Sequence, residues 1–220
     1  MPNKNDADPA RLIDDAPMSD MLRALARCGE PRRLRKGAQI ISEGELGDTL
    51  FIIVQGSLRA YSAGLDGREI TYGSYGVGEY VGEMGLDGGP RAAHVEAEQS
   101  SVVVVITRAT LETHLREQPQ FAFELLAKVI RRARNATLGM RQIALNDVYG
   151  RLKALLESLA SECADGSRLI DPAPSQLEMS QRIGCGRAMV TRVMCDLERG
   201  GYVEVGRRRV RLHRVLPARW

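Results

Sequence analysis

A glycine-rich segment near the middle of the chain carries one acid and one base. Residues 82–93 read GEMGLDGGPRAA, so Glu83 and Arg91 stand eight residues apart. Backbone N–H groups at the start of a short helix form a site for an anion, and the planar guanidinium of Arg91 suits a phosphate. The Glu83 carboxylate can accept hydrogen bonds from two sugar hydroxyls. The segment therefore predicts a site for a ribose phosphate, and its single arginine favours a singly charged cyclic diester.

The last quarter of the chain holds a second pattern, which consists of two short helices. Ser175 and Glu178 are placed as the N-cap and the third residue of a capping box, which starts a helix over 175–183. The turn 184–186 reads GCG and separates this helix from a second one over 187–199. Two helices joined by a tight glycine turn are the signature of a helix-turn-helix.

The second helix and a following hairpin are predicted to contact DNA. The hairpin has strands at 202–205 and 210–212 and a tip that reads GRRR, so it forms a basic wing. Arg187 and Arg192 can each bond a guanine in the major groove, although an Arg192–Asp196 ion pair is the alternative. The other polar groups hold phosphates and set the register. The residues assigned to DNA are Ser175, Gln176, Gly186, Arg187, Ala188, Thr191, Arg192, Arg207, Arg208 and Arg209.

Short strands punctuated by glycine surround the segment 82–93. They run from about Leu34 to Thr107, with a hairpin signal at Asp66-Gly67. Strands this closely spaced predict a β-roll or a barrel-like sandwich rather than an alternating βαβ fold. The predicted strands are 39–41, 50–54, 58–61, 70–72 and 102–106.

Helices replace strands beyond Thr107. A short helix is predicted over 108–116, and Pro119 suits the first turn of a long helix that runs to about Asn146. Asp147 can cap a further helix from Val148 to about Cys163.

The long helix carries an apolar seam. Its apolar residues alternate three and four apart, which is the a/d pattern of a coiled coil. We therefore predict a parallel homodimer along this helix. The alternative is that the helix packs on its own β-roll through Phe121, Leu125 and Leu138. The seam residues are Ala122, Leu126, Val129, Ala133, Ala136, Met140 and Ile143.

These motifs together resemble the CRP/FNR family of regulators from about Leu34 to the C-terminus. GEMGLDGGPRAA is similar to the phosphate-binding cassette of cyclic-nucleotide-binding domains, and residues 82–93 are called the cassette below. The resemblance implies that Glu83 holds the ribose 2′-hydroxyl and Arg91 the cyclic phosphate. It also implies a homodimer on a palindromic operator, with RNA polymerase as a further partner.

The resemblance also extends the ligand site onto the long helix. Ala136 and Thr137 match two hydroxyl residues that contact the base in the family, although Ala136 lacks the hydroxyl. Arg132, one turn earlier, is placed to stack on the ligand or to bond it. Ala92 stands where bacterial cyclic-AMP receptors carry serine and matches eukaryotic cyclic-AMP domains, which favours cyclic AMP. The predicted ligand site is Gly82, Glu83, Met84, Arg91, Ala92, Arg132, Ala136 and Thr137.

Two alternatives stay open for the effector. Cyclic di-GMP would need extra cations, for which Arg131, Arg132 and Arg134 lie in the right segment. A ligand-independent regulator would instead keep Glu83 and Arg91 as an internal ion pair. The recognition helix opens with Gly186-Arg187-Ala188 where the family usually has Ser-Arg-Glu, so its DNA half-site is expected to differ.

Composition limits the class of protein. The net charge of +3 conceals a basic end, since residues 181–220 hold ten arginines against three acids. Such a basic block indicates a polyanionic partner. Four separated cysteines with no neighbouring histidines predict no metal site or other cofactor. No nucleophile, phosphate-loop or metalloprotease motif appears, so we predict no catalytic residues and no enzyme.

The fold class predicted is α+β, with an N-terminal β-roll like that of cyclic-nucleotide-binding domains, a long dimerisation helix and a C-terminal winged helix-turn-helix. No apolar run approaches the roughly 20 residues of a membrane span, and the first residues lack a signal peptide's apolar region, so a cytoplasmic protein is expected. The expected segments are a disordered tail (1–17), the β-roll (18–118), the dimerisation helix (119–146) and the DNA-binding domain (147–220).

Overall fold

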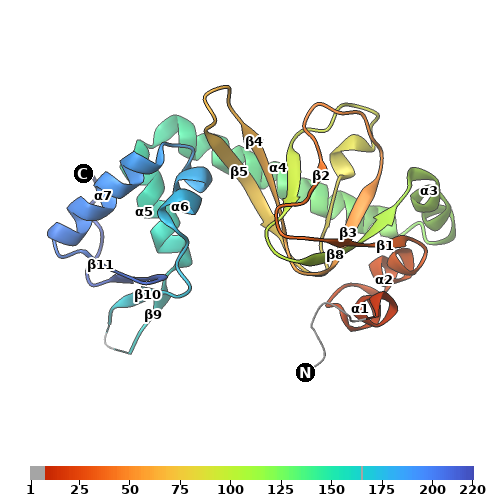
Figure 1. Cartoon of the computed structure of the whole chain (residues 1–220), viewed down its shortest axis with the longest axis horizontal. Helices are drawn as coiled ribbons and strands as arrows, with labels where there is room; N and C mark the ends of the chain where they lie inside the picture. Colours follow the sequence, from red (N-terminus) through yellow and green to blue (C-terminus); the bar gives the residue numbers. More distant parts are fainter. Residues whose placement is uncertain (1–7, 165) are drawn as a thin grey trace. The chain divides into compact units, whose positions relative to one another are not determined.

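The computed structural model describes residues 8–164 and 166–220 (Figure 1). The described chain divides into two compact units. The first contains residues up to 62 together with 71–132, and the second contains 63–70 together with 133–220.

The first unit is built on two antiparallel sheets, which confirms the predicted β-roll. One sheet has the order β1-β8-β3-β6 and the other β2-β7-β4-β5. A shared apolar core of both sheets includes Phe51, Ile53, Leu58, Val95 and Val103. The strands are β1 (Glu30–Leu34), β2 (Gln39–Ile41), β3 (Leu50–Gln55), β4 (Leu58–Ala63), β5 (Glu69–Tyr75), β6 (Tyr80–Val81), β7 (His94–Ala97) and β8 (Ser101–Ile106).

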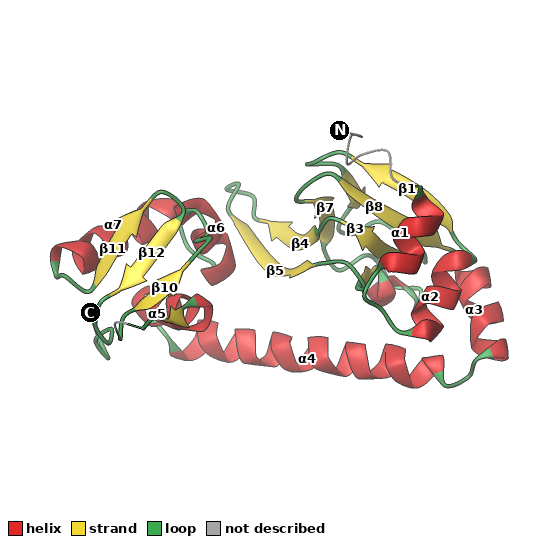
Figure 2. Cartoon of the chain, turned by 90° about the horizontal axis from the view of Figure 1, so that it is seen from below, coloured by secondary structure: helices red, strands yellow, loops and turns green. Residues whose placement is uncertain are grey.

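Helices cover the outer face of the first sheet (Figure 2). Leu22 and Leu25 pack there with Ile52 and Val104 of the sheet, and with Phe121 at the start of the long helix. The helices concerned are α1 (Pro9–Asp15), α2 (Asp20–Arg27), α3 (Arg108–Glu117) and α4 (Phe121–Leu145). The short 3-10 helix η1 (Glu83–Gly85) lies in the cassette.

The expected disordered tail is wrong for the residues that the structure describes. Asp8 caps α1 by accepting a hydrogen bond from the Ala10 N–H at 3.1 Å. Pro9 occupies the first turn, where its missing N–H costs no hydrogen bond. Ile13 is buried in the core of the first unit. Residues 1–7 of the expected tail lie outside the described residues.

The long helix α4 has 25 residues, close to the predicted length. Phe121 is buried and Leu125 packs against the same core, whereas Leu138 is exposed. Apolar packing on its own β-roll is therefore confined to the start of the helix. Six of the seven predicted seam residues lie beyond the first turn and all seven are exposed in the single chain, with Leu126 54% and Met140 73% exposed.

The second unit is a winged helix-turn-helix, as predicted. Its helices share an apolar core with the wing, including Leu152, Leu156, Val190, Leu197 and Val210. The sheet order is β11-β12-β10-β9. The elements are α5 (Val148–Leu159), α6 (Gln176–Ile183), α7 (Arg187–Arg199), β9 (Ser161–Glu162), β10 (Arg168–Ile170), β11 (Val203–Gly206) and β12 (Arg209–Leu212).

One predicted boundary in this unit is wrong. Asp147 caps α5, because its carboxylate accepts from the Gly150 N–H at 2.7 Å. The helix ends at Leu159, however, and does not reach Cys163. Ser161 and Glu162 instead pair with β10, whose hydrogen bonds favour extended backbone there.

Candidate functional site

Two glycines of the cassette create the turn that places its charged residues. Gly82 follows β6 with φ at +97°, a conformation that favours glycine. A Cβ at this position would also lie 2.5 Å from the Thr49 carbonyl oxygen. At Gly85 a Cβ would lie 2.3 Å from the Gly47 carbonyl oxygen. These close approaches fold the cassette tightly against the loop before β3.

Glu83 is buried and already has a cationic partner. Its side chain is 6% exposed and forms an ion pair with Arg132 of α4. Arg132 also donates to the Tyr80 carbonyl oxygen at 2.5 Å, and its guanidinium lies 4.5 Å from the centre of the Tyr75 ring. The predicted alternative in which Glu83 pairs with Arg91 is therefore wrong, because α4 supplies the cation instead.

Arg91 is also buried, but no carboxylate pairs with it among the described residues. It is 7% exposed, and Nη1 donates to the Gly82 carbonyl at 2.7 Å. Nη2 donates to the Thr49 carbonyl at 3.0 Å and to Thr49 Oγ1 at 2.9 Å. Burial lowers the pKa of Arg91, while the charges of Asp48 and Glu83 oppose that shift. Neither of these carboxylates forms an ion pair with the guanidinium, and a buried cation whose charge is only partly offset is costly, so a bound anion would stabilise this corner.

A row of polar side chains fixes the first half of α4 to the first unit. Glu124 accepts from the Ser19 hydroxyl at 2.7 Å, and Lys128 lies 3.3 Å from Glu79. With Arg132 these residues are four apart, so they share one face of the helix. Burial lowers the pKa of Lys128, and Glu79 opposes the shift. Of these three residues only Arg132 was predicted from the sequence, and it was predicted as a contact of the ligand.

Two tyrosines complete the surroundings of the cassette and were missed from the sequence. Tyr75 lies beneath Arg132, and the Tyr80 ring centre lies 4.8 Å from the Lys128 ammonium. Burial raises the pKa of both phenols. Their positions just before the cassette in an aromatic-poor chain are a signal that could have been used.

The other predicted ligand residues are more exposed. Met84 is 62% exposed, and Ala92 and Ala136 are exposed as well. The hydroxyl of Thr137 donates to the Ala133 carbonyl of its own helix at 3.0 Å. Their roles remain predictions, since these contacts do not test them.

The DNA-binding module begins with the predicted capping box. The Ser175 N–H donates to the Glu178 carboxylate at 2.6 Å, and the Glu178 N–H donates to Ser175 Oγ at 3.2 Å. The hydrogen bond from the Ser175 backbone lowers the pKa of Glu178. Gly184 ends α6 at φ +65°, which turns the chain into α7.

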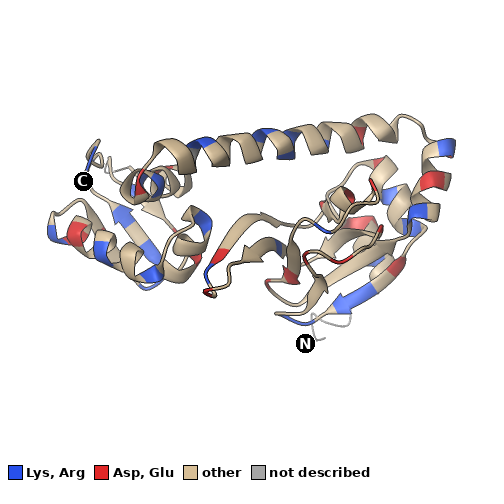
Figure 3. Ribbon diagram, turned by 90° about the horizontal axis from the view of Figure 1, so that it is seen from above, with Lys and Arg blue, Asp and Glu red and all other residues tan. Residues whose placement is uncertain are grey.

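The N-terminal half of α7 displays the predicted base-reading residues. Arg187, Ala188 and Arg192 are exposed. Asp196 pairs with Arg199 at 3.3 Å, so the alternative ion pair between Arg192 and Asp196 is wrong. Both candidate base-reading arginines are free of ion pairs within the described part of the chain. Figure 3 shows how basic residues gather on this unit.

Other predicted DNA residues differ in how firmly they are held. The Thr191 hydroxyl donates to Gln176 Oε1 at 2.6 Å, which joins the start of α6 to the recognition helix. Gly186 is the N-cap of α7 and makes no side-chain cap. In the wing, Arg209 lies 2.7 Å from Asp171.

The remaining two wing arginines point outward. Arg207 and Arg208 are both exposed, and neither belongs to an ion pair among the described residues. Arg208 has φ at +57°, which is uncommon outside glycine. The wing therefore offers two uncommitted cations and one that is held by an acid.

Two other kinds of site are absent from the described residues. No helix there is both long and apolar enough to cross a membrane. No group of three or more histidine, cysteine, aspartate or glutamate side chains lies close enough there to hold a metal ion.

Comparison with known proteins gives consistent matches. Residues 31–118 match the family model of the cyclic nucleotide-binding domain. The chain is 30% identical to the cAMP-activated global transcriptional regulator Vfr of Pseudomonas aeruginosa, over 82% of this chain and 87% of that protein.

Solved structures share the fold. The c-di-GMP responsive global regulator CLP of Xanthomonas campestris superposes with a TM-score of 0.78 at 21% identity, covering 88% of this chain and 98% of that one. A transcriptional regulator of the CRP/FNR family from Thermus thermophilus superposes with a TM-score of 0.61, also at 21% identity, covering 84% and 94%. At these identities the likeness shows the fold alone.

Proposed function

The chain belongs to the CRP/FNR family of transcription regulators, and on that premise we propose that it is a DNA-binding homodimer controlled by a cyclic nucleotide. The observation that carries this proposal is Arg91, a buried guanidinium with no carboxylate paired to it among the described residues. A cyclic phosphate would supply the missing negative charge. The relatives are regulators, and we assign this chain no catalytic step.

Cyclic AMP is the effector we propose. A single buried arginine suits one phosphate charge, and the curated relative from Pseudomonas aeruginosa carries cAMP in its name. Cyclic di-GMP is the second candidate, and its second phosphate needs another cation. Arg132 is engaged by Glu83, which leaves the exposed Arg131 and Arg134 for that role. The geometry therefore favours the mononucleotide.

The proposed mechanism is an exchange of partners at Glu83. Ribose hydroxyls donate to Glu83 in the bound state. Arg132 then leaves Glu83 and either turns toward the ligand or moves away from the site. Because Arg132 belongs to α4, the exchange changes how that helix is held, and it shifts the population of dimer arrangements. The favoured arrangement places two recognition helices about 34 Å apart, one turn of DNA. RNA polymerase is the proposed downstream partner.

The proposed dimer rests on the exposed seam of α4. Replacing Val129 by glutamate would place two like charges at facing positions of the seam. We expect this variant to sediment as a monomer and to lose operator binding, while Arg134→Glu, off the seam, remains dimeric. A dimeric Val129→Glu protein would refute the seam as the interface.

The effector is tested by calorimetric titration of the full chain with cyclic AMP, cyclic GMP and cyclic di-GMP. We expect cyclic AMP to bind with a dissociation constant in the micromolar range or below. Arg91→Lys should raise that constant at least tenfold, because lysine lacks the planar fork of arginine. Arg116→Ala, an exposed arginine on α3, is the matched control.

Three outcomes of the titration count against the proposal. If cyclic di-GMP bound more tightly than cyclic AMP, it would be the effector instead, and the proposed ligand-controlled regulator would stand. No binding of any nucleotide, with operator binding intact, would leave a ligand-independent regulator. Equal losses in Arg91→Lys and Arg116→Ala would show that the cassette is not the site.

A further inference from the structure

The N-terminal half of α7 carries two small side chains between two cations. Arg187, Ala188 and Arg192 are exposed, and Thr191 is half-buried. These residues occupy positions i, i+1, i+4 and i+5, so they form two neighbouring rows on one surface of the helix. The other side of α7 packs in the core of the second unit. The surface that α7 can present to DNA therefore combines two arginines with two residues that carry a methyl group.

The hydroxyl of Thr191 is already engaged within the protein. It lies 2.6 Å from Gln176 Oε1 and 3.1 Å from the Arg187 carbonyl oxygen. Both partners are acceptors, so they use the single hydroxyl proton. A hydroxyl bonded to the carbonyl four residues earlier also fixes the side-chain torsion, and the methyl group is held with it. Thr191 therefore offers a base its methyl group rather than a hydrogen-bond donor.

Ala188 supplies a second methyl group beside the first. It lies three residues before Thr191, so the two side chains are neighbours on the helix surface. In the major groove the four bases differ in their donors and acceptors, and thymine alone adds a methyl group, at C5. Alanine and threonine methyl groups both suit an apolar contact with it. The small side chains between the arginines thus match one base.

We propose that Ala188 and Thr191 read the C5-methyl group of a thymine in each operator half-site, beside a guanine that Arg187 or Arg192 bonds. This inference rests on the proposed function, because it needs the recognition helix to lie in the major groove. It assigns the half-site a thymine that is selected by apolar packing and not by a hydrogen bond. Cytosine at the same place lacks the methyl group, and 5-methylcytosine restores it.

A contact through the Thr191 hydroxyl is the alternative. Its lone pairs can accept from the amino group of adenine or cytosine. Such a contact survives replacement by serine but not by valine, whereas a methyl contact survives valine but not serine. Thr191→Val also breaks the bond to Gln176, which should weaken binding to every duplex alike. The ratio of affinities for two duplexes on the same protein cancels that general loss, so the ratio is the quantity to measure.

The experiment selects binding sites for the full-length protein from random duplexes, with and without cyclic AMP. Each thymine of the selected half-site is then replaced by uracil, which removes only the methyl group, and affinity is measured by fluorescence anisotropy. We expect one thymine to respond, with a loss of about fourfold in one half-site and about 15-fold in both, the effect of one and two buried methyl groups. At that position 5-methylcytosine should bind more tightly than cytosine.

The protein variants assign this response to its residues. Thr191→Ser should lower the thymine-to-uracil ratio below about twofold, and Thr191→Val should keep it near about fourfold. Ala188→Gly should also lower the ratio.

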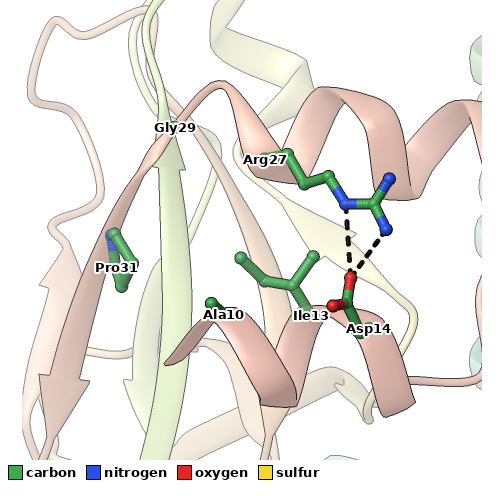
Figure 4. Close-up of a pocket in the computed structure, with 6 residues that line it drawn as sticks. All are labelled: Ala10, Ile13, Asp14, Arg27, Gly29 and Pro31. Atoms are coloured by element: carbon green, nitrogen blue, oxygen red, sulfur yellow. Dashed lines mark hydrogen bonds and ion pairs between the residues drawn. The ribbon is translucent and has the colours of Figure 1, made fainter. Parts of the chain in front are cut away.

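Ala10→Gly is the matched control for Ala188→Gly. Ala10 is the exposed second residue of α1, as Ala188 is of α7. It lines a cavity of the first unit whose two charged side chains, Asp14 and Arg27, pair with each other at 2.7 Å (Figure 4). That cavity offers no uncommitted cation to DNA, so Ala10→Gly should leave the ratio unchanged.

The outcomes separate this inference from the proposed function. Unchanged affinity after uracil replacement at every thymine, or a ratio that Thr191→Ser leaves intact, would overturn the inference while the DNA-binding regulator stands. A ratio lost in Thr191→Val but kept in Thr191→Ser would show a hydroxyl contact instead. If the selection returned no common sequence, the proposed function itself would fail, and the inference with it.

Discussion

The cassette and the recognition helix both rely on arginine, but they hold it in opposite ways. Arg91 is 7% exposed and its fork is bonded to carbonyl groups, while Arg132 is paired with the buried Glu83. Arg187 and Arg192 are exposed and unpaired within the described residues. A small ligand must be surrounded by its site, whereas a long polymer is met at the surface.

This difference divides the energetic roles of the charges. A buried charge contributes to the stability of the fold as well as to binding, because its removal leaves other buried groups unpaired. An exposed charge contributes to binding and little to the fold. Variants of the cassette should therefore change both unfolding and ligand binding, and variants of α7 should change DNA binding alone.

The largest effect is expected for Arg132→Met. It leaves the Glu83 carboxylate buried without its partner, which should destabilise the first unit by about 3 kcal/mol. Urea unfolding followed by circular dichroism measures this loss. The double variant with Glu83→Gln removes the stranded charge, so it should recover much of the stability. Unchanged unfolding in the single variant would mean that the buried ion pair does not support the fold.

Arg187→Ala should have the next largest effect, and it should change DNA binding alone. Loss of a two-pronged contact to guanine costs about 1–3 kcal/mol of discrimination, which weakens operator binding about five- to 150-fold. Unfolding should stay within about 0.5 kcal/mol of the wild type because the side chain is exposed. Arg199→Ala, at the far end of the same helix, is the control. A loss of stability in Arg187→Ala as large as that in Arg132→Met would contradict the difference between the two regions.

Local signals in the sequence predicted the second unit better than the first. The capping box, the Gly184 turn and the apolar spacing of α7 act within a few residues, so they can be read directly. Strand β1 was missed because its residues EPRRL lack an apolar alternation, and pairing with β8 holds it extended. Helix α1 was missed although Asp8-Pro9 is a recognisable N-cap and first turn.

The missed contacts of the site are long-range. Glu83 and Arg91 were identified from their spacing, but the partner of Glu83 comes from 49 positions further along the chain. Tyr75 and Tyr80 join the site because strands β5 and β6 bring them to the same face of α4. Such neighbours depend on tertiary packing, and no local pattern predicts which aromatic residue will lie beneath which cation.

The capping box should show a smaller effect that depends on pH. The Ser175 N–H lowers the pKa of Glu178, so the ionised carboxylate is favoured in the folded protein. Its stabilising effect is fully present above the ordinary pKa near 4.5 and is lost as pH falls through the lower folded value. We expect Glu178→Gln to cost about 1 kcal/mol at pH 7 and nothing in strong acid. Urea unfolding between pH 2 and 7 tests this, and a constant difference would contradict it.

Substitutions in the wing should have the smallest effects. This one loop contains an arginine without an ion pair and an arginine that is held by a carboxylate. Arg208 is uncommitted, so Arg208→Ala should weaken binding to all duplexes equally and reduce the salt slope by about one. Arg209 must first leave Asp171, an exposed partner whose ion pair contributes at most about 1 kcal/mol. Arg209→Ala should therefore have a smaller effect on the slope. Measurements of affinity from 50 to 200 mM salt would separate the two, and identical slopes would show that a partner at the surface does not restrain a phosphate-binding arginine.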